Sequence, residues 1–440
     1  MKTYFGIVAA AVLSALAWGF IVGNQPMPAR AYAPGPEVDS TWYEALPTDP
    51  AAATAAYLDR VPAEARARGD AFENTRYIAL PLGIITLLGT TALLMFSGAA
   101  SAMRGLARRV SPSLPLQDAM LAFLVLATYF LLGLPVSTYV GFVRFRQAGF
   151  SHAPYLQWLR DTSLQWAVIT VFSIVGVVAI YWLIRRRPRS WPGWATLVYA
   201  VLSAVFVLIS PQYIDPLFNK FTPMADGPQK QAILSLARAN GVPAADVFVQ
   251  DASRQGVLLN AHVSGFGETA RIVLDDNTIA ATPHPEVAMV MAHEIGHYVL
   301  SHVVKGIVFD TLVTGIGFLF VGWGLLGLLG RFGSRWDVGD SADIGGLPLL
   351  WCLFTLWGIL SLPLSNSIAR GQEKEADLYG LNASRQPLAV AEFMIRDADA
   401  RRLDPSWIEE TVFYAHPSGR NRVFMAMRWR AEHLLDETSR

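Results

Sequence analysis

Seven long runs without a charged residue set the strongest limit on how this chain can fold. A helix needs about 20 residues to cross the roughly 30 Å hydrocarbon core of a bilayer, and soluble helices rarely stay uncharged for so long. The runs are Thr3–Pro28, Tyr77–Met103, Ala119–Val143, Thr162–Ile184, Ser190–Ile214, Thr311–Gly330 and Ile344–Ala369. They predict a mainly α-helical protein, a polytopic seven-helix transmembrane bundle.

The composition agrees with a membrane protein. Of the 440 residues, 53% are hydrophobic and 16% are charged, whereas about a quarter are charged in soluble domains. The formal net charge is zero, so no nucleic acid is expected as a partner. A single cysteine, Cys352, excludes an intrachain disulfide framework. The lipid bilayer is therefore the first partner that the sequence indicates.

The first run permits two interpretations. Lys2, an apolar stretch and then Ala31-Tyr32-Ala33 fit a secretory signal peptide with a small-residue cleavage site. The stretch Phe5–Val22 is long for a signal core, which favours a retained helix. We expect residues 1–23 to form a first transmembrane helix, or a signal peptide, before an extramembrane loop over residues 24–76.

The rest of the chain divides into membrane and extramembrane segments. We expect transmembrane helices 2–5 over 77–214 and helices 6–7 over 311–369, with extramembrane segments over 215–310 and 370–440. Two crossings separate these last segments, so both emerge on one membrane face and can build one site. In the first of them the pattern predicts helices over Pro228–Asn240 and from Pro285 to about His302, and strands near Val247–Gln250, Val257–Val263 and Arg271–Asp275.

The second predicted helix carries His293-Glu294-Ile295-Gly296-His297. Histidines at i and i+4 lie on one face of a helix, about one turn apart, and can both reach one Zn²⁺. Glu294 lies beside them, where a carboxylate can take a proton from water at the metal. A chance match is the alternative to this metal site.

A catalytic zinc site needs three protein ligands and one open position. Glu373 and Asp377 are one helical turn apart directly after the last membrane run. Glu373 can bind the metal while Asp377 orients a ligand imidazole; the alternative is a solvated helix start, where acids are favoured. Glu375 lies on another face and is a weaker candidate.

Two more histidines compete for a role. His302 follows His297 by five residues, which places it off the metal-binding face, so we expect a surface position. His416, restrained by Pro417, belongs to the segment that must fold back near the metal. It could donate a hydrogen bond to a developing oxyanion.

These motifs together resemble the CAAX prenyl protease type 1 family of integral-membrane zinc metallopeptidases. The resemblance covers about Ser190 to Arg422 in order, and the seven-span plan. It is carried by five stretches, which are Pro211–Met224, Asn260–Gly267 followed by Arg271–Asp275, His293–His297, Glu373–Asp377, and His416-Pro-Ser-x-x-x-Arg422. Five motifs in the same order are far more specific than one zinc signature.

The resemblance implies a gluzincin-like α+β zinc peptidase domain built from two segments on one membrane face, holding one Zn²⁺ per chain. It implies His293, His297 and Glu373 as zinc ligands and Glu294 as the catalytic acid/base. His416 and Arg422 would lie beside the substrate and the transition state. Asn260 and Ala261 would pair with the substrate backbone, because an extended peptide can add to a sheet edge.

The residues also leave alternatives open. The substrate could be a prenylated CAAX-type protein, or another membrane-associated protein in a quality-control role, and the peptide could be lipidated or not. A rival class is a metal-binding transporter or sensor without hydrolase activity, and a structural zinc site would show a fourth protein ligand. Arginine clusters at Arg104–Arg109 and Arg185–Arg189 favour an active site outside the cytoplasm, whereas the resemblance implies a cytosolic one.

Overall fold

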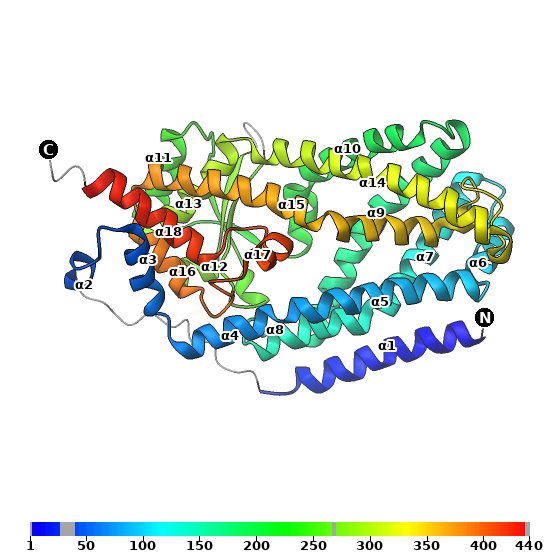
Figure 1. The fold of residues 1–440 in the computed structure, drawn as a ribbon, viewed down its shortest axis with the longest axis horizontal. Helices are drawn as coiled ribbons and strands as arrows, with labels where there is room; N and C mark the ends of the chain where they lie inside the picture. Colours follow the sequence, from blue (N-terminus) through cyan, green and yellow to red (C-terminus); the bar gives the residue numbers. More distant parts are fainter. Residues whose placement is uncertain (1, 27–39, 266–269, 436–440) are drawn as a thin grey trace.

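The computed structural model describes residues 2–26, 40–265 and 270–435. The small-residue stretch Ala31-Tyr32-Ala33, on which the signal-peptide interpretation rests, lies outside these residues. Among the described residues, seven helices are long and apolar enough to cross a membrane, as predicted. They are α1 (Lys2–Gly23), α5 (Thr75–Phe96), α7 (Leu114–Ser137), α9 (Tyr155–Arg186), α10 (Trp191–Ile209), α14 (His302–Phe332) and α15 (Leu347–Ser384). In Figure 1, α1, α5, α14 and α15 run along the long axis, with the small sheet at the other end from α6 (Ala99–Val110) and the N-terminus.

Helix α14 shows how these spans are sorted between lipid and protein. Leu319, Trp323 and Leu326 are 61%, 76% and 69% exposed and follow one face of the helix. Phe318, Val321 and Leu325 lie on the opposite face, in the buried core of the bundle. The exposed apolar face fits contact with lipid chains, because hydrocarbon is as good a solvent for leucine as a protein core.

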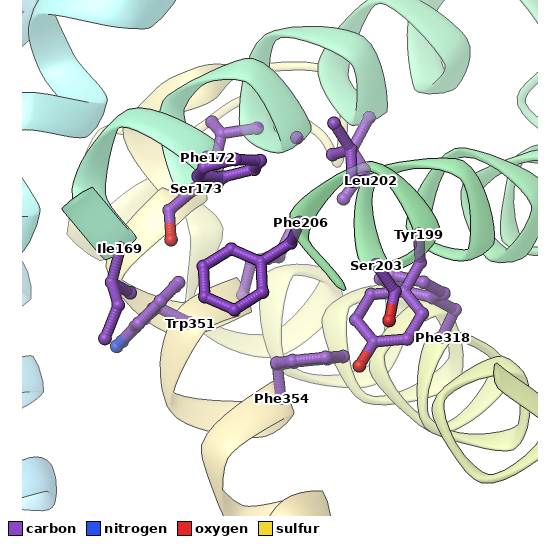
Figure 2. A pocket seen from close by; sticks show the side chains of 14 residues that line it. Ile169, Phe172, Ser173, Tyr199, Leu202, Ser203, Phe206, Phe318, Trp351 and Phe354 are labelled. Atoms are coloured by element: carbon purple, nitrogen blue, oxygen red, sulfur yellow. The ribbon is translucent and has the colours of Figure 1, made fainter. Parts of the chain in front are cut away.

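The bundle also has an open apolar pocket of about 390 Å³ between α9, α10, α14 and α15 (Figure 2). Figure 2 shows Phe172, Phe206 and Phe354 along its wall, with the hydroxyls of Ser203 and Tyr199 at one side.

Ion pairs join α6 to the loop between α14 and α15 at the end of the bundle away from the sheet. Arg104 of α6 pairs with Asp337 at 2.6 Å and with Asp343.

A four-stranded sheet forms the centre of the extramembrane part. The strands are β1 (Phe221–Pro223), β2 (Val247–Gln250), β3 (Ala261–Ser264) and β4 (Arg271–Asp275), in the order β1-β2-β4-β3. Strands β2 and β4 are parallel, and the other pairs are antiparallel. Helices α11 (Pro228–Ala239) and α13 (His284–Val299) share a buried core with the sheet, built around Ile272, Leu274, Met291 and Ile295. The strand expected over Val257–Val263 is shorter and begins at Ala261.

The first extramembrane loop packs onto the C-terminal tail. Its helices α2 (Ser40–Glu44), α3 (Pro50–Asp59) and α4 (Ala63–Glu73) precede α5, and α3 contacts α16 (Pro387–Arg396) and α18 (Gly419–Arg430). Tyr57 and Leu58 are buried there with Met394 and Val423. Segments from both ends of the chain therefore share one core on the face that carries the sheet. Other short α-helices in the described ranges are α8 (Arg144–Gln147), α12 (Asp276–Ala281) and α17 (Trp407–Phe413).

The long helix expected from Pro285 to about His302 was wrong at its end. Helix α13 stops at Val299, and Ser301 adopts a left-handed backbone conformation with φ 56°. Helix α14 then begins at His302. The prediction failed because no glycine or proline marks this break in the sequence.

Candidate metal centre

Two helices from segments far apart in the sequence cross at the centre of the extramembrane part. Helix α13 packs against the end of α15 that extends beyond the last membrane run. Glycines permit this contact: a Cβ added to Gly380 would lie 3.1 Å from the backbone nitrogen of His293, and one added to Gly296 would lie 3.1 Å from Cβ of Tyr379. The two helix backbones can therefore approach closely, which brings the side chains of both motifs together.

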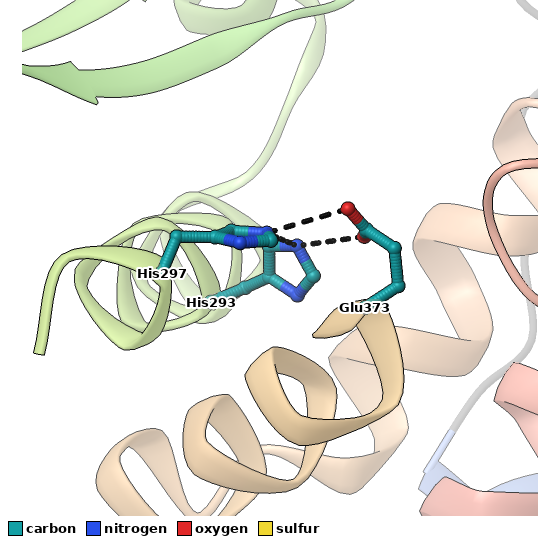
Figure 3. Close-up of side chains that lie close together, drawn as sticks. All are labelled: His293, His297 and Glu373. Carbon is teal, nitrogen blue, oxygen red and sulfur yellow. Dashed lines mark hydrogen bonds and ion pairs between the residues drawn. The ribbon is translucent and has the colours of Figure 1, made fainter. Parts of the chain in front are cut away.

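The three predicted metal-binding side chains meet at this crossing (Figure 3). Nε2 of His293 and Nε2 of His297 are 3.1 Å apart. The Glu373 carboxylate lies 3.3 Å from the first nitrogen and 3.5 Å from the second, through its two oxygens. In Figure 3 the carboxylate points from α15 toward both imidazole rings on α13.

This arrangement fits a small divalent metal ion. With bonds of about 2.0–2.1 Å in tetrahedral geometry, neighbouring ligand atoms lie about 3.4 Å apart, close to the three separations found here. Glu373 Oε2 is buried yet accepts no hydrogen bond of normal geometry. Burial also lowers the pKa of His297 to about 4, so its imidazole is neutral and can donate a lone pair. In the described part of the chain, only His293, His297 and Glu373 form such a group.

Asp377 lies behind the first histidine, where the sequence placed it. Its Oδ1 is 2.9 Å from Nδ1 of His293. Arg422 of α18 holds the same carboxylate through two nitrogens, Nε at 2.9 Å and Nη2 at 2.5 Å. Both the aspartate and the arginine are buried, so a bidentate ion pair fixes the group that orients His293.

Glu294 faces a cavity of about 250 Å³ beside the two histidines. Burial raises the pKa of Glu294 to about 7. A carboxyl group with a pKa near the working pH can both accept and return a proton. The other residues around the cavity are Leu259, Asn260, Ala261, Met289, Val290, His293, Phe393, Arg401, His416 and Arg422. This set includes every substrate-side residue that the sequence singled out, and adds Phe393 and Arg401, which no motif marked.

His416 reaches the same cavity from the C-terminal tail. Its Nε2 lies 3.4 Å from Oε2 of Glu373, and its side chain is 55% exposed. Arg370, at the start of the extramembrane end of α15, donates to the carbonyl oxygens of Glu410 and Tyr414 at 2.6 and 2.5 Å. This holds the turn that carries His416. The described metal-binding group does not include His416, and the cavity is lined by both His293 and His416.

Asn260 and Ala261 lie at the start of β3, the edge strand of the sheet. The backbone N–H of Asn260 donates to Thr278 Oγ1 at 2.9 Å, and its carbonyl accepts from the N–H of Asp275 at 3.1 Å. Within the described sheet, β3 pairs on one side with β4. Because Asn260 and Ala261 also line the cavity, the other edge of the strand starts beside Glu294 and His416.

His302 is the residue near the site that sequence reasoning misjudged, whereas Glu375, the weaker ligand candidate, does lie outside the metal-binding group. The expected surface position of His302 was wrong: it is 4% exposed, and its Nδ1 lies 2.9 Å from Nδ1 of His297. Glu375 contacts His302 at 3.1 Å rather than the metal-binding group. The break between α13 and α14 is what brings His302 back to the site, and no glycine or proline marks this break.

The fold and the site define a polytopic membrane protein with a group of metal-binding residues at an extramembrane helix crossing. Comparison with known families agrees. Residues 224–430 match the model of peptidase family M48, and residues 65–220 match that of the CAAX prenyl protease N-terminal region with five membrane helices. The chain belongs to the CAAX prenyl protease type 1 family of M48 peptidases.

Relatives come from bacteria and eukaryotes. An uncharacterized metalloprotease of Bacillus subtilis, YhfN, is 32% identical over 269 residues, which cover 60% of this chain and 63% of that protein. CAAX prenyl protease 1 of Saccharomyces cerevisiae is 29% identical over 314 residues, covering 67% and 68%. The match therefore spans just under two thirds of the bacterial relative. Among solved structures, S. mikatae Ste24p aligns over 96% of this chain and 98% of that chain, with a TM-score of 0.71 and 22% identity, which supports the fold.

Proposed function

We propose that this protein is a zinc-dependent endopeptidase that cleaves peptide bonds in membrane-associated proteins. The observation that carries the proposal is the set of separations between His293, His297 and Glu373, 3.1, 3.3 and 3.5 Å. Two nitrogens and one carboxylate with a side open to a cavity are the ligand set of catalytic rather than structural zinc sites. The site would hold one Zn²⁺ per chain.

Bound there, zinc would supply Lewis acidity toward a substrate carbonyl and lower the pKa of a water molecule toward neutrality. Glu294 is the residue placed to accept that water's proton and to return it to the leaving amine. Its burial and its place beside the histidine pair support this role. Asp377 and Arg422 keep the first imidazole in a fixed orientation throughout.

The substrate-side residues would align the peptide and stabilise charge. At Ala261, β3 can pair with an extended substrate through main-chain hydrogen bonds on the edge that no described strand covers. The main chain of Asn260 already bonds to Thr278 and Asp275, so its side chain is the part that can contact the substrate. His416, on its turn held by Arg370, can donate a hydrogen bond to the oxygen that becomes negative in the transition state. Arg422 adds a buried positive charge on the same side of the cavity.

The proposed substrates are CAAX-type proteins, cleaved near their C-terminus. This follows the names of the relatives, CAAX prenyl protease 1 from yeast and its homologues in mouse and human. Glu373 lies directly after the last uncharged membrane run, which ends at Ala369, and this suits a substrate tethered to the bilayer by a lipid. A broader role in removing damaged membrane proteins would use the same chemistry, so the two differ only in their need for the lipid.

One assay tests both the activity and the substrate. The full-length protein in liposomes is given a farnesylated CAAX-type peptide and the same peptide without the lipid, with and without a chelator. We expect cleavage that the chelator abolishes and added Zn²⁺ restores, and faster cleavage of the farnesylated form. Equal rates on both peptides would favour the broader role. Cleavage that survives full metal removal, or no cleavage of either peptide by the metal-loaded protein, would contradict the proposal.

A further inference from the structure

His302 lies against the metal centre although it belongs to a membrane-spanning helix. Its ring is 4% exposed, and the ring centroids of His302 and His297 are 4.9 Å apart with an interplanar angle of 74°. Nδ1 of His302 lies 2.9 Å from Nδ1 of His297. This is the nitrogen of His297 that faces away from the metal-binding group, since its Nε2 faces His293 and Glu373.

The backbone at Ser301 makes this contact possible. In an unbroken helix, residues five apart point in directions about 140° apart, so His302 would point away from the site. Instead α13 ends at Val299, Ser301 takes φ 56° and ψ 37°, and α14 starts at His302. A non-glycine residue in the left-handed region is uncommon and carries a conformational cost. This unfavourable conformation of Ser301 turns the imidazole of His302 toward His297.

Beyond His302 the contacts continue to a carboxylate. Nε2 of His302 lies 3.1 Å from Oε2 of Glu375, and the same oxygen accepts from Nζ of Lys305 at 3.0 Å. Only one assignment of protons satisfies this series of hydrogen bonds from His297 through His302 to Glu375. If Nε2 of His297 binds a metal, its proton is on Nδ1 and is donated to Nδ1 of His302, whose own proton is then on Nε2 and is donated to Glu375.

We propose that His302 and Glu375 are positioning residues that fix the tautomer and ring orientation of His297. The inference rests on the proposed metal centre. Each ligand histidine then has a partner at its Nδ1. Asp377, which is paired with Arg422, lies beside His293. His302 lies beside His297 and contacts Glu375, which is paired with Lys305. Hydrogen bonds of this kind orient a ligand imidazole and increase its basicity, and losing them costs about 10–100-fold in metal affinity.

The test measures zinc binding itself. The full-length protein, purified in detergent and stripped of metal, competes with a fluorescent chelator for Zn²⁺. His302→Phe keeps a ring of similar shape without nitrogens, and we expect its affinity to fall about 10–100-fold. Glu375→Ala should weaken binding in the same direction, and Glu375→Gln should recover part of the loss because it keeps an accepting oxygen. Bound Co²⁺ should also change its absorption spectrum in His302→Phe, a change that loss of stability alone would not produce.

Three controls separate the possible failures. His284→Ala removes an exposed histidine from the first turn of α13 and should bind Zn²⁺ like the wild type. His297→Ala should lose Zn²⁺. If His297→Ala loses zinc while His302→Phe and Glu375→Ala bind as tightly as the wild type, the positioning role is wrong and the metal centre stands. If the wild type binds no Zn²⁺, both are wrong. Should His302→Phe fail to fold, Glu375→Ala decides alone, because its side chain is 54% exposed.

Discussion

Oδ1 of Asp377 lies 2.9 Å from Nδ1 of His293, so an aspartate on α15 holds a metal-binding histidine on α13. Asp377→Asn keeps the shape of this group and removes its charge, and we expect metal affinity to fall about 10–100-fold. Titration of the metal-free protein with Zn²⁺ measures the change. Asp404→Asn is a matched control, because Asp404 is a half-exposed partner of Arg420, and such surface pairs contribute at most about 1 kcal/mol. Equal losses in both variants would mean that Asp377 has no special role.

Glu294→Gln separates metal binding from turnover. The amide keeps the size of the side chain but cannot accept a proton from water, so we expect kcat to fall by about 10²–10⁴-fold. The zinc content should stay at one per chain, because the three predicted ligands are untouched. Metal analysis and peptide cleavage on the same preparation test both parts. A variant that cleaves at the wild-type rate would remove Glu294 from the mechanism.

The close contact of α13 with α15 should be sensitive to a single methyl group. A Cβ at Gly380 would meet backbone atoms of His293 at 3.1 and 3.2 Å, whereas nothing lies within 4 Å of one at Gly371 on the same helix. Both substitutions to alanine gain about 0.8–1.0 kcal/mol of helix propensity. We expect Gly371→Ala to be neutral or stabilising, and Gly380→Ala to lower the unfolding temperature and weaken zinc binding. Thermal unfolding of both variants, with and without Zn²⁺, gives the comparison.

The features that could be predicted from the sequence are mainly those set by residues close together along the chain. The seven spans and the pairing of His293 and His297 follow from local hydrophobicity and helix periodicity. Glu373 was predicted because two crossings force its segment onto the face that carries the histidines. The membrane topology and the ligand types of catalytic zinc sites were sufficient to predict Glu373 as the third ligand.

The parts that could not be predicted depend on tertiary structure. The left-handed conformation of Ser301 has no sequence mark, so the burial of His302 was missed. Packing of α3 against α18 joins segments over 350 residues apart in the numbering, and no periodicity indicates such a contact. The parallel pairing of β2 with β4 likewise depends on how α11 and α13 cover the sheet.

Asp275 should make stability depend on pH. It is 5% exposed at the end of β4, its Oδ1 has no hydrogen-bond partner, and burial raises its pKa to about 7. An unfolded aspartate has a pKa of about 3.9. Because the folded pKa is the higher one, the contribution of this group to stability is fully present below about pH 4 and is lost as the pH rises through about 7.

Asp275→Asn removes this dependence. We expect the variant to unfold at a higher temperature than the wild type at pH 8, and the difference to shrink as the pH falls toward 5. Asp404→Asn, which removes the charge of a half-exposed aspartate, is the control for a general loss of charge. Thermal unfolding of the metal-free protein at both pH values measures the effect. A difference that stays constant between pH 5 and pH 8 would show that Asp275 titrates normally.

The central claim is that α13 and α15 together bind one catalytic metal ion with an open coordination position. The most direct measurement is the anomalous difference density at the zinc absorption edge, from crystals of the zinc-loaded protein. We predict a single peak bonded to Nε2 of His293, Nε2 of His297 and the carboxylate of Glu373, at about 2.0–2.2 Å, with water or substrate in the remaining position. A peak elsewhere, or a fourth side chain filling that position, would contradict the claim.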